Sequence, residues 1–281
     1  MTEKGKNIFK IVINYTVSAI TAVFIFLFCC SVAIGVLSSK SYIKSSVKTT
    51  DYIALSAEEL KENMISLAIP SGLPDNFFDD KINNAALLKL NNNCIDNAYD
   101  KGAFSIDAAN ITQYHIDIFK EYAESGALAS DTDVTDESLN YLAELCTEKY
   151  KKTAANSVFK YLSFYAAKIN KFMPFAIIGT LLFSVFCVVF LLKLSKSQND
   201  KRYIYYALCG SGIMTALIPL IVLLGGFIKK ISISSRAMHL FIISFVNNIL
   251  LILVILGIIL IALAVFFLLF KNKNEKKEKN S

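Results

Sequence analysis

The two histidines of this chain are the first residues to consider for metal or acid–base chemistry. His115 and His239 belong to no HExxH motif, and the sequence contains no CxxC or GxSxG string. Zinc-dependent hydrolysis and esterase chemistry at a nucleophile elbow therefore lack their local signatures. His115 shares an apolar helical stripe with Ile111 and Ile118, which is typical of a core histidine rather than of a ligand. We predict no metal or cofactor site.

The six cysteines fall into two groups. Four lie within long apolar stretches, where we expect them to behave as small apolar side chains: Cys29, Cys30, Cys187 and Cys209. Cys94 and Cys146 lie instead in a polar segment that we expect to be exported, each on an apolar helical stripe. An oxidising exterior would allow these two to form a disulfide. Their spacing leaves the disulfide and a pair of buried thiols both open.

An acidic string occupies residues 131–135. Asp131, Asp133 and Thr135 resemble the DxDxT string of haloacid-dehalogenase-type phosphatases, in which the first aspartate is the nucleophile. In that family the string follows a buried apolar strand, and no such strand precedes it here. A calcium loop is also excluded, because Asp136 stands where glycine is needed and Leu142 where a bidentate glutamate is needed. We interpret the string as an acidic loop that ends in a helix cap.

Small residues recur every fourth position in one apolar stretch. Gly210 and Gly212 begin a partial phosphate-loop pattern, but no strand precedes them. Close packing of membrane helices is the better interpretation, because Ala207, Ser211 and Thr215 share one helical face. In the first apolar stretch, we interpret four polar residues as interhelical hydrogen-bond partners, with a polar solute path as the alternative: Asn14, Thr16, Ser18 and Thr21.

The elements that position these residues belong to an unusually apolar chain. Apolar residues make up 54% of the 281 residues, and the mean hydropathy is +0.49, well above an ordinary globular composition. Four stretches without a formal charge are each long enough to cross a bilayer: 11–37, 172–192, 203–228 and 249–270. We predict an all-α integral membrane protein with four transmembrane helices and a helical-bundle extracytoplasmic domain between the first and second spans. Asn247 and Asn248 should mark the exterior end of the fourth span.

The distribution of positive charge predicts the orientation. Twelve lysines and arginines lie in three segments that are separated by even numbers of spans: 1–10, 193–202 and 271–281. Because cations beside spans are retained inside, both termini and the 193–202 loop should be cytoplasmic. Segment 38–171 and the loop 229–248 should then be exterior. The basic tail is interpreted as an orientation signal, not a nucleic-acid site, and the first stretch as an uncleaved anchor because it exceeds a signal-peptide core.

Segment 38–171 contains start and stop signals for several helices, as a helical bundle requires. Ser56 and Glu59 have the spacing of a capping box at a helix start, and that helix should stop before the turn cluster 70–74. Further helices are expected over 76–99, after a cap at Asp107, and from Thr135 directly into the second span, where Pro174 can kink the helix.

Two loops of this segment are candidate partner surfaces. Their residues are Leu73, Phe77 and Phe78 in the first loop and Asp131, Asp133 and Asp136 in the second. Apolar residues at a loop tip suit an interface, and the aspartates suit a basic partner. The alternative for the first loop is that its three apolar residues staple the second helix onto the bundle.

Four spans with one large exterior loop resemble tetraspanins and claudins in outline. The large loop here lies between the first and second spans, unlike the tetraspanin arrangement, and the chain has no tryptophan, which a claudin-like loop needs. Neither family is therefore assigned. The composition, rich in Ile, Asn and Lys, indicates an AT-rich bacterial genome and hence a multi-pass protein of the plasma membrane.

Three functions are compatible with this organisation. We expect a non-enzymatic protein in the lipid bilayer whose exterior domain binds a protein or cell-envelope partner, since the polar, patterned surface lies outside. A component of a transporter or channel is the alternative, although the predicted spans contain no ionisable carboxylate or cation. An enzyme with scattered exterior carboxylates is the third.

Overall fold

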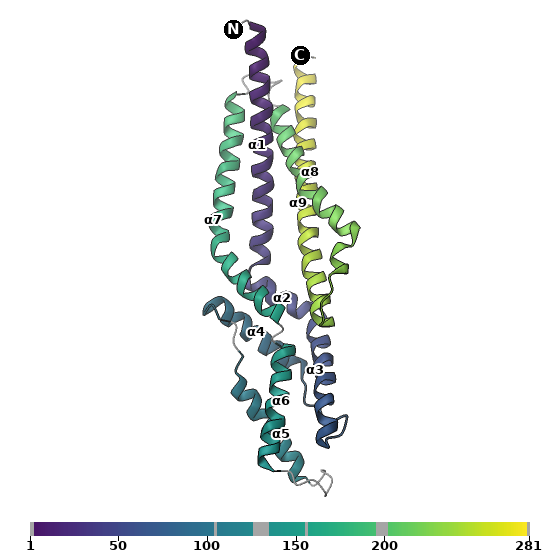
Figure 1. Cartoon of the computed structure of the whole chain (residues 1–281). Helices are drawn as coiled ribbons and strands as arrows, with labels where there is room; N and C mark the ends of the chain where they lie inside the picture. The colour runs from purple at the N-terminus through teal and green to yellow at the C-terminus, as the bar shows by residue number, and fades with distance from the viewer. Residues whose placement is uncertain (1–2, 104–105, 126–134, 155–156, 195–201, 280–281) are drawn as a thin grey trace. The chain divides into compact units, whose positions relative to one another are not determined.

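The structure is a computed structural model that describes the chain except residues 1–2, 104–105, 126–134, 155–156, 195–201 and 280–281, with backbone alone for 3–7, 154, 157–158 and 270–279 (Figure 1). The described residues form helices and no strand, which confirms the all-α prediction. The helices are α1 (Glu3–Leu37), α2 (Lys40–Thr49), α3 (Tyr52–Ala68), η1 (Ile69–Ser71), α4 (Asn84–Asp100), α5 (Ala108–Glu124), α6 (Asp136–Ala154), α7 (Ser157–Leu194), α8 (Arg202–Gly225), η3 (Phe227–Lys230) and α9 (Arg236–Lys279).

Four of these helices are long and apolar enough to cross a membrane, as predicted. Their candidate spans are Ile8–Leu37, Phe159–Leu194, Arg202–Gly225 and Arg236–Leu269. The third helix ends before the predicted boundary, because Gly226 adopts a φ of 61°, which terminates α8. The fourth begins earlier than predicted, so Asn247 and Asn248 lie inside α9.

The chain divides into two compact units. The span unit comprises Met1–Leu37, Ile169–Lys230 and Val246–Ser281, and the interspan unit comprises Ser38–Lys168 and Ile231–Phe245. The interspan unit therefore combines chain from both segments for which we predicted an exterior location. Helices α7 and α9 each contribute residues to both units.

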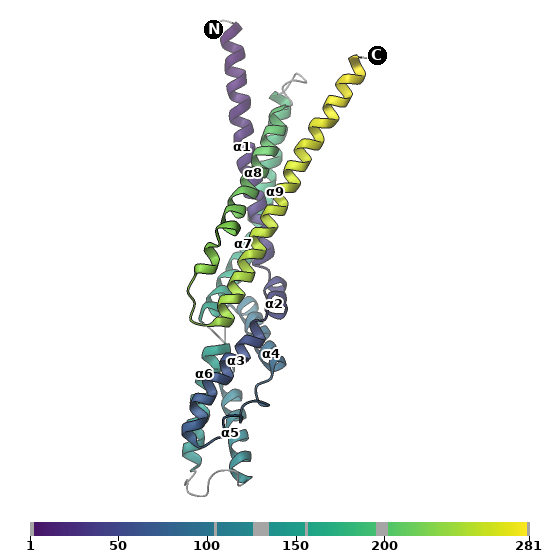
Figure 2. The same ribbon diagram turned by 90° about the vertical axis from the view of Figure 1, so that its right-hand side faces the viewer.

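The span unit is built from helices whose apolar side chains remain largely exposed. Large side chains such as Phe175 and Leu224 are 76% and 81% exposed, which suits contact with lipid and would be costly in water. The N-terminal end of α1 and the C-terminal end of α9 lie at the same end of this unit (Figures 1 and 2).

Helix α8 packs through the face of small residues that the sequence indicated. Ala207, Ser211 and Thr215 are all buried. A Cβ atom on Gly257 of α9 would lie 2.7 Å from the backbone oxygen of Gly212, so α8 and α9 approach closely at these two glycines. The spacing that predicts the small-residue face of α8 does not include Gly257.

The four polar residues of α1 that were predicted as interhelical partners differ in their hydrogen bonds. Ser18 Oγ donates to the Tyr203 carbonyl of α8 at 2.7 Å, as predicted for an interhelical bond. Thr16 and Thr21 instead donate to carbonyls one turn earlier in α1. Asn14 is buried, and its Oδ1 has no hydrogen-bond partner in the described structure.

The interspan unit is a bundle of short helices, which depend on packing because isolated helices of this length are marginal in water. Helix α6 packs against α3 and α5, and α2 packs against α4. Tyr52, Phe159 and Phe241 form one buried aromatic cluster, with ring centroids 5.3–5.8 Å apart. Phe241 comes from the first turns of α9, so the start of the fourth candidate span completes this core.

Two of the predicted helix caps are present in the structure, and other predicted helix starts are not. Asp107 accepts from the Asn110 amide, and Thr135 accepts from the Ser138 amide, as the predicted caps at these residues require. The capping box at Ser56 is wrong, because α3 begins at Tyr52 and Ser56 lies buried inside it. The second predicted helix starts later, at Asn84, and α2 was not expected.

The structure describes α6 and α7 over the segment predicted as one continuous helix, and the continuity between them is not tested. Residues 155–156 between them lie outside the described structure. Pro174 lies inside α7, which continues to Leu194.

Candidate functional site

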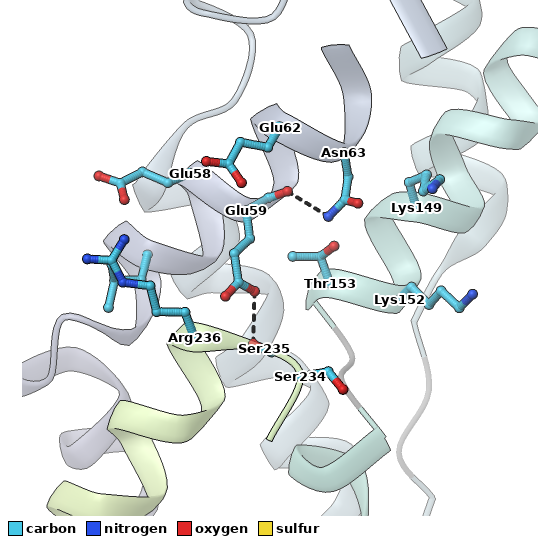
Figure 3. A pocket seen from close by; sticks show the side chains of 11 residues that line it. Glu58, Glu59, Glu62, Asn63, Lys149, Lys152, Thr153, Ser234, Ser235 and Arg236 are labelled. Carbon is cyan, nitrogen blue, oxygen red and sulfur yellow. Dashed lines mark hydrogen bonds between the residues drawn. The ribbon is translucent and has the colours of Figure 1, made fainter. Parts of the chain in front are cut away.

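The interspan unit contains a charged groove between α3, α6 and the residues that lead into α9 (Figure 3). Its volume is about 530 Å³. The lining residues are Leu55, Glu58, Glu59, Glu62 and Asn63 from α3, Lys149, Lys152 and Thr153 from α6, and Ser234, Ser235 and Arg236. We call this feature the mixed-charge groove.

Glu59 joins α3 to the beginning of α9. Its two carboxylate oxygens accept hydrogen bonds from the Ser235 hydroxyl at 2.8 Å and from the Ala237 amide at 2.9 Å. The Ser235 oxygen in turn accepts from the Met238 amide at 3.1 Å. A carboxylate is favoured there, because the first amides of a helix have no partner within the helix and carry partial positive charge. The Glu59–Ser235 pair is thus a shared helix cap.

The other five charged side chains of the groove have no such partner. Within the described structure, Glu58 and Glu62 of α3, Lys149 and Lys152 of α6, and Arg236 form no ion pair or hydrogen bond through their side chains. Four of them are exposed, and Lys149 is half-buried. Figure 3 shows Glu58 and Glu62 on the α3 wall and the two lysines on the opposite α6 wall.

This arrangement suits binding more than bond-breaking chemistry. The lining contains neither histidine nor cysteine. Ser235 is the hydroxyl nearest a base, but its oxygen already accepts from the Met238 amide and its hydrogen is held by Glu59. Unpaired charges of both signs, by contrast, can attract a ligand that carries complementary charges.

The three apolar residues predicted as a partner surface in the first loop, 69–77 and Phe78, are buried in the structure. Leu73, Phe77 and Phe78 are 7%, 6% and 2% exposed. The Phe77 ring lies 5.7 Å from the ring of Phe119 and 5.0 Å from that of Tyr122, both in α5. The structure therefore places these three residues in the bundle core, as the staple interpretation requires. Packing within the bundle removes their apolar side chains from water, which is favourable.

The acidic partner loop lies mostly outside the described residues. Asp131 and Asp133 fall in residues 126–134, and Asp136 begins α6. The Asp136 side chain is 80% exposed, and its carboxylate lies 3.2 Å from Lys120 Nζ. It is neither in nor beside the mixed-charge groove.

Cys94, Cys146 and His115 lie in the core of the interspan unit. Both cysteines are thiols in the structure, so the disulfide is not formed there, and burial raises their pKa to about 11 and about 12. His115 Nδ1 lies 3.2 Å from the Thr147 hydroxyl, and burial lowers the pKa of the imidazole to about 4. Among the described residues, no three His, Cys, Asp or Glu side chains come together as a metal site.

The mixed-charge groove is not predicted from the sequence. The spacing of Ser56 and Glu59 predicts a cap of their own helix, whereas the structure pairs Glu59 with Ser235, 176 residues later. The available signal was Ser235 itself, a good N-cap residue immediately before a long apolar helix.

Comparisons with protein-family models, with curated proteins and with solved structures find no match to this chain.

Proposed function

We propose that this chain is a non-enzymatic four-pass protein of a bacterial plasma membrane whose interspan unit faces the exterior and binds a protein or cell-envelope partner in the mixed-charge groove. Both termini are cytoplasmic in this proposal, in accordance with the twelve cations of segments 1–10, 193–202 and 271–281. The apolar, exposed faces of the four candidate spans support the membrane location.

The observation that carries the proposal is the set of five unpaired charges around one groove. Glu58 and Glu62 offer carboxylates on one side, and Lys149 and Lys152 offer ammonium groups on the other. Elsewhere in the same unit, close pairs such as Lys44 and Asp96, 2.7 Å apart, neutralise each other. Opposite charges that do not pair internally suit an extended segment of a partner that carries both a cation and an anion.

Site-specific photo-crosslinking in the native membrane tests the proposal. A photoreactive residue at Thr153, inside the groove, should give a discrete adduct with a protein or wall fragment. The same residue at Glu121, exposed on α5 and outside the groove, should not.

Charge reversal then tests the chemistry of the groove. E58K/E62K should reduce the Thr153 adduct by about tenfold, since like charges opposed across a binding surface cost on the order of 1 kcal/mol or more. The matched control E121K/E124K makes the same change in net charge on α5 and should leave the adduct unchanged. Equal adducts at Thr153 and Glu121, or none at Thr153, would refute partner binding in the groove.

A transporter component is the alternative, and Asn14 is the observation that favours it. This residue is 1% exposed within the span unit and its Oδ1 has no hydrogen-bond partner among the described residues, and an unsatisfied polar group inside a span is a candidate contact for a polar solute. Solute flux in proteoliposomes that falls in N14L but persists in E58K/E62K would support the transporter. Absence of flux for ions and small polar solutes would exclude it.

A further inference from the structure

A second hollow in the interspan unit shares part of α6 with the mixed-charge groove. It has a volume of about 520 Å³ and is lined by Ile106, Leu145, Glu148, Lys149, Lys151, Lys152 and Lys160. We call it the lysine hollow. Lys151 and Lys160 line this hollow and do not line the mixed-charge groove, so the two features can be changed separately.

The lysine hollow has a strong excess of positive charge. Its lining contains four lysines and a single carboxylate, that of Glu148, and within the described structure no side chain of the four lysines has an ion pair or a hydrogen bond. Several lysines elsewhere in this unit are paired with aspartates: Lys40, Lys44, Lys61, Lys81 and Lys120. Gathering like charges without counter-charges is unfavourable, so a multivalent anion would be attracted there.

The cations of the hollow suit phosphate. All four are lysines, whose compact ammonium groups bind phosphate as point charges. Ile106 and Leu145 provide an apolar contact for the carbon groups that join successive phosphates.

We infer that the lysine hollow binds the phosphate groups of a polyanionic phosphodiester ligand. This site goes beyond the partner binding proposed for the mixed-charge groove, because it needs neither Glu58, Glu62 nor Arg236. Phosphate of this kind can come from a soluble polymer or from anionic lipid headgroups, and both sources present the same group to the lysines.

Titration of the full-length protein with inorganic tripolyphosphate tests the site. The protein is held in nanodiscs of zwitterionic phosphatidylcholine, so that the lipid adds no net charge. We expect saturable binding that weakens as salt is raised, because exposed charges are screened. In K151Q/K160Q the affinity should fall about tenfold, in line with the loss of two charge contacts.

The matched control removes two positive charges elsewhere on the same unit. Lys89 and Lys101 are exposed on α4 and at its end, outside the hollow, so K89Q/K101Q should bind tripolyphosphate within about twofold of the unchanged protein. Equal losses in the two variants would show an effect of net charge alone and overturn the inference, as would the absence of saturable binding. Retained binding in E58K/E62K would show that the hollow is independent of the mixed-charge groove.

Nanodiscs that contain phosphatidylglycerol distinguish the two phosphate sources. If these anionic lipids displace tripolyphosphate from the unchanged protein, the natural source is the bilayer. If tripolyphosphate binds equally well in both nanodiscs, the source is a soluble phosphodiester polymer.

Discussion

Glu59 joins α3 to the start of α9, and its removal should loosen the start of α9. E59A leaves the Ala237 amide and the Ser235 hydroxyl without their acceptor. Loss of a helix cap costs about 1–2 kcal/mol, which corresponds to roughly tenfold faster local opening. Hydrogen–deuterium exchange of residues 231–245 measures the rate of this local opening. E58A, at a neighbouring glutamate without a partner, should leave exchange in this segment unchanged, and equal exchange in both variants would contradict the cap.

His115 should make the interspan unit less stable in mild acid. The folded imidazole has a pKa of about 4 because burial disfavours its charged form, whereas an exposed histidine titrates at 6.5. Between these values the unfolded chain binds the extra proton, so stability rises with pH there and is lost as pH falls below 6.5. The loss approaches about 3 kcal/mol near pH 4.

The variant H115Q separates this contribution from that of the carboxylates. It should be less stable than the unchanged protein at pH 7, because the aromatic side chain is lost from the core, but its stability should fall less between pH 6.5 and 4.5. Denaturant unfolding at several pH values measures both quantities. An unchanged dependence on pH would contradict a buried, neutral His115.

Cys94 and Cys146 should resist alkylation until the interspan unit unfolds. Burial raises the pKa of both thiols, so little thiolate is present at pH 8, and reagents have no access to the sulfur atoms. Iodoacetamide should label neither residue in the folded protein and both in denaturant, without reductant. If denatured Cys94 and Cys146 react only after reduction, they form a disulfide in the cell.

The crossing of α8 and α9 should be intolerant of added volume. A Cβ on Gly257 would lie 2.7 Å from both the Ala216 nitrogen and the Gly212 oxygen, backbone atoms that cannot turn away. G257A should therefore lower the stability of the span unit by about 1–3 kcal/mol, as in other overpacked interiors.

The matched substitution for G257A is G179A. Gly179 also lies within a membrane helix, α7, and a Cβ there would meet nothing within 4 Å. G179A should leave thermal unfolding in detergent unchanged or slightly improved, since alanine favours a helix. Equal midpoints for the two variants would contradict close packing at Gly257.

The twelve lysines and arginines of segments 1–10, 193–202 and 271–281 predict the orientation of the protein in the membrane. Single cysteines at Ser197 and Ser281, in a background without the native cysteines, should be protected from an impermeant maleimide in intact cells, whereas one at Asp131 should react. Reaction at Ser197 or Ser281, or protection at Asp131, would reverse or abolish the proposed topology. After the cells are lysed, all three cysteines should react with the maleimide, which would confirm that each variant is expressed.

The features that could be read from the amino-acid sequence depend on neighbours along the chain. The four spans were found because charge is absent over at least twenty consecutive residues, and a bilayer requires that composition whatever the rest of the chain does. The caps at Asp107 and Thr135 were found because each side chain bonds to an amide three residues later. The small-residue face of α8 follows from helical spacing alone.

The features that could not be read depend on partners far away in the chain. Ser56 and Glu59 have the spacing of a capping box, yet Glu59 caps α9, because packing brings a helix start with unsatisfied amides to its carboxylate. The sequence left open whether Leu73, Phe77 and Phe78 form an exposed tip or pack into the bundle; all three are buried, and Phe77 and Phe78 pack against Phe119 of α5. The two charged hollows combine residues of α3, α6, α7 and α9, and folding assembles them because the apolar faces beneath them must be buried together.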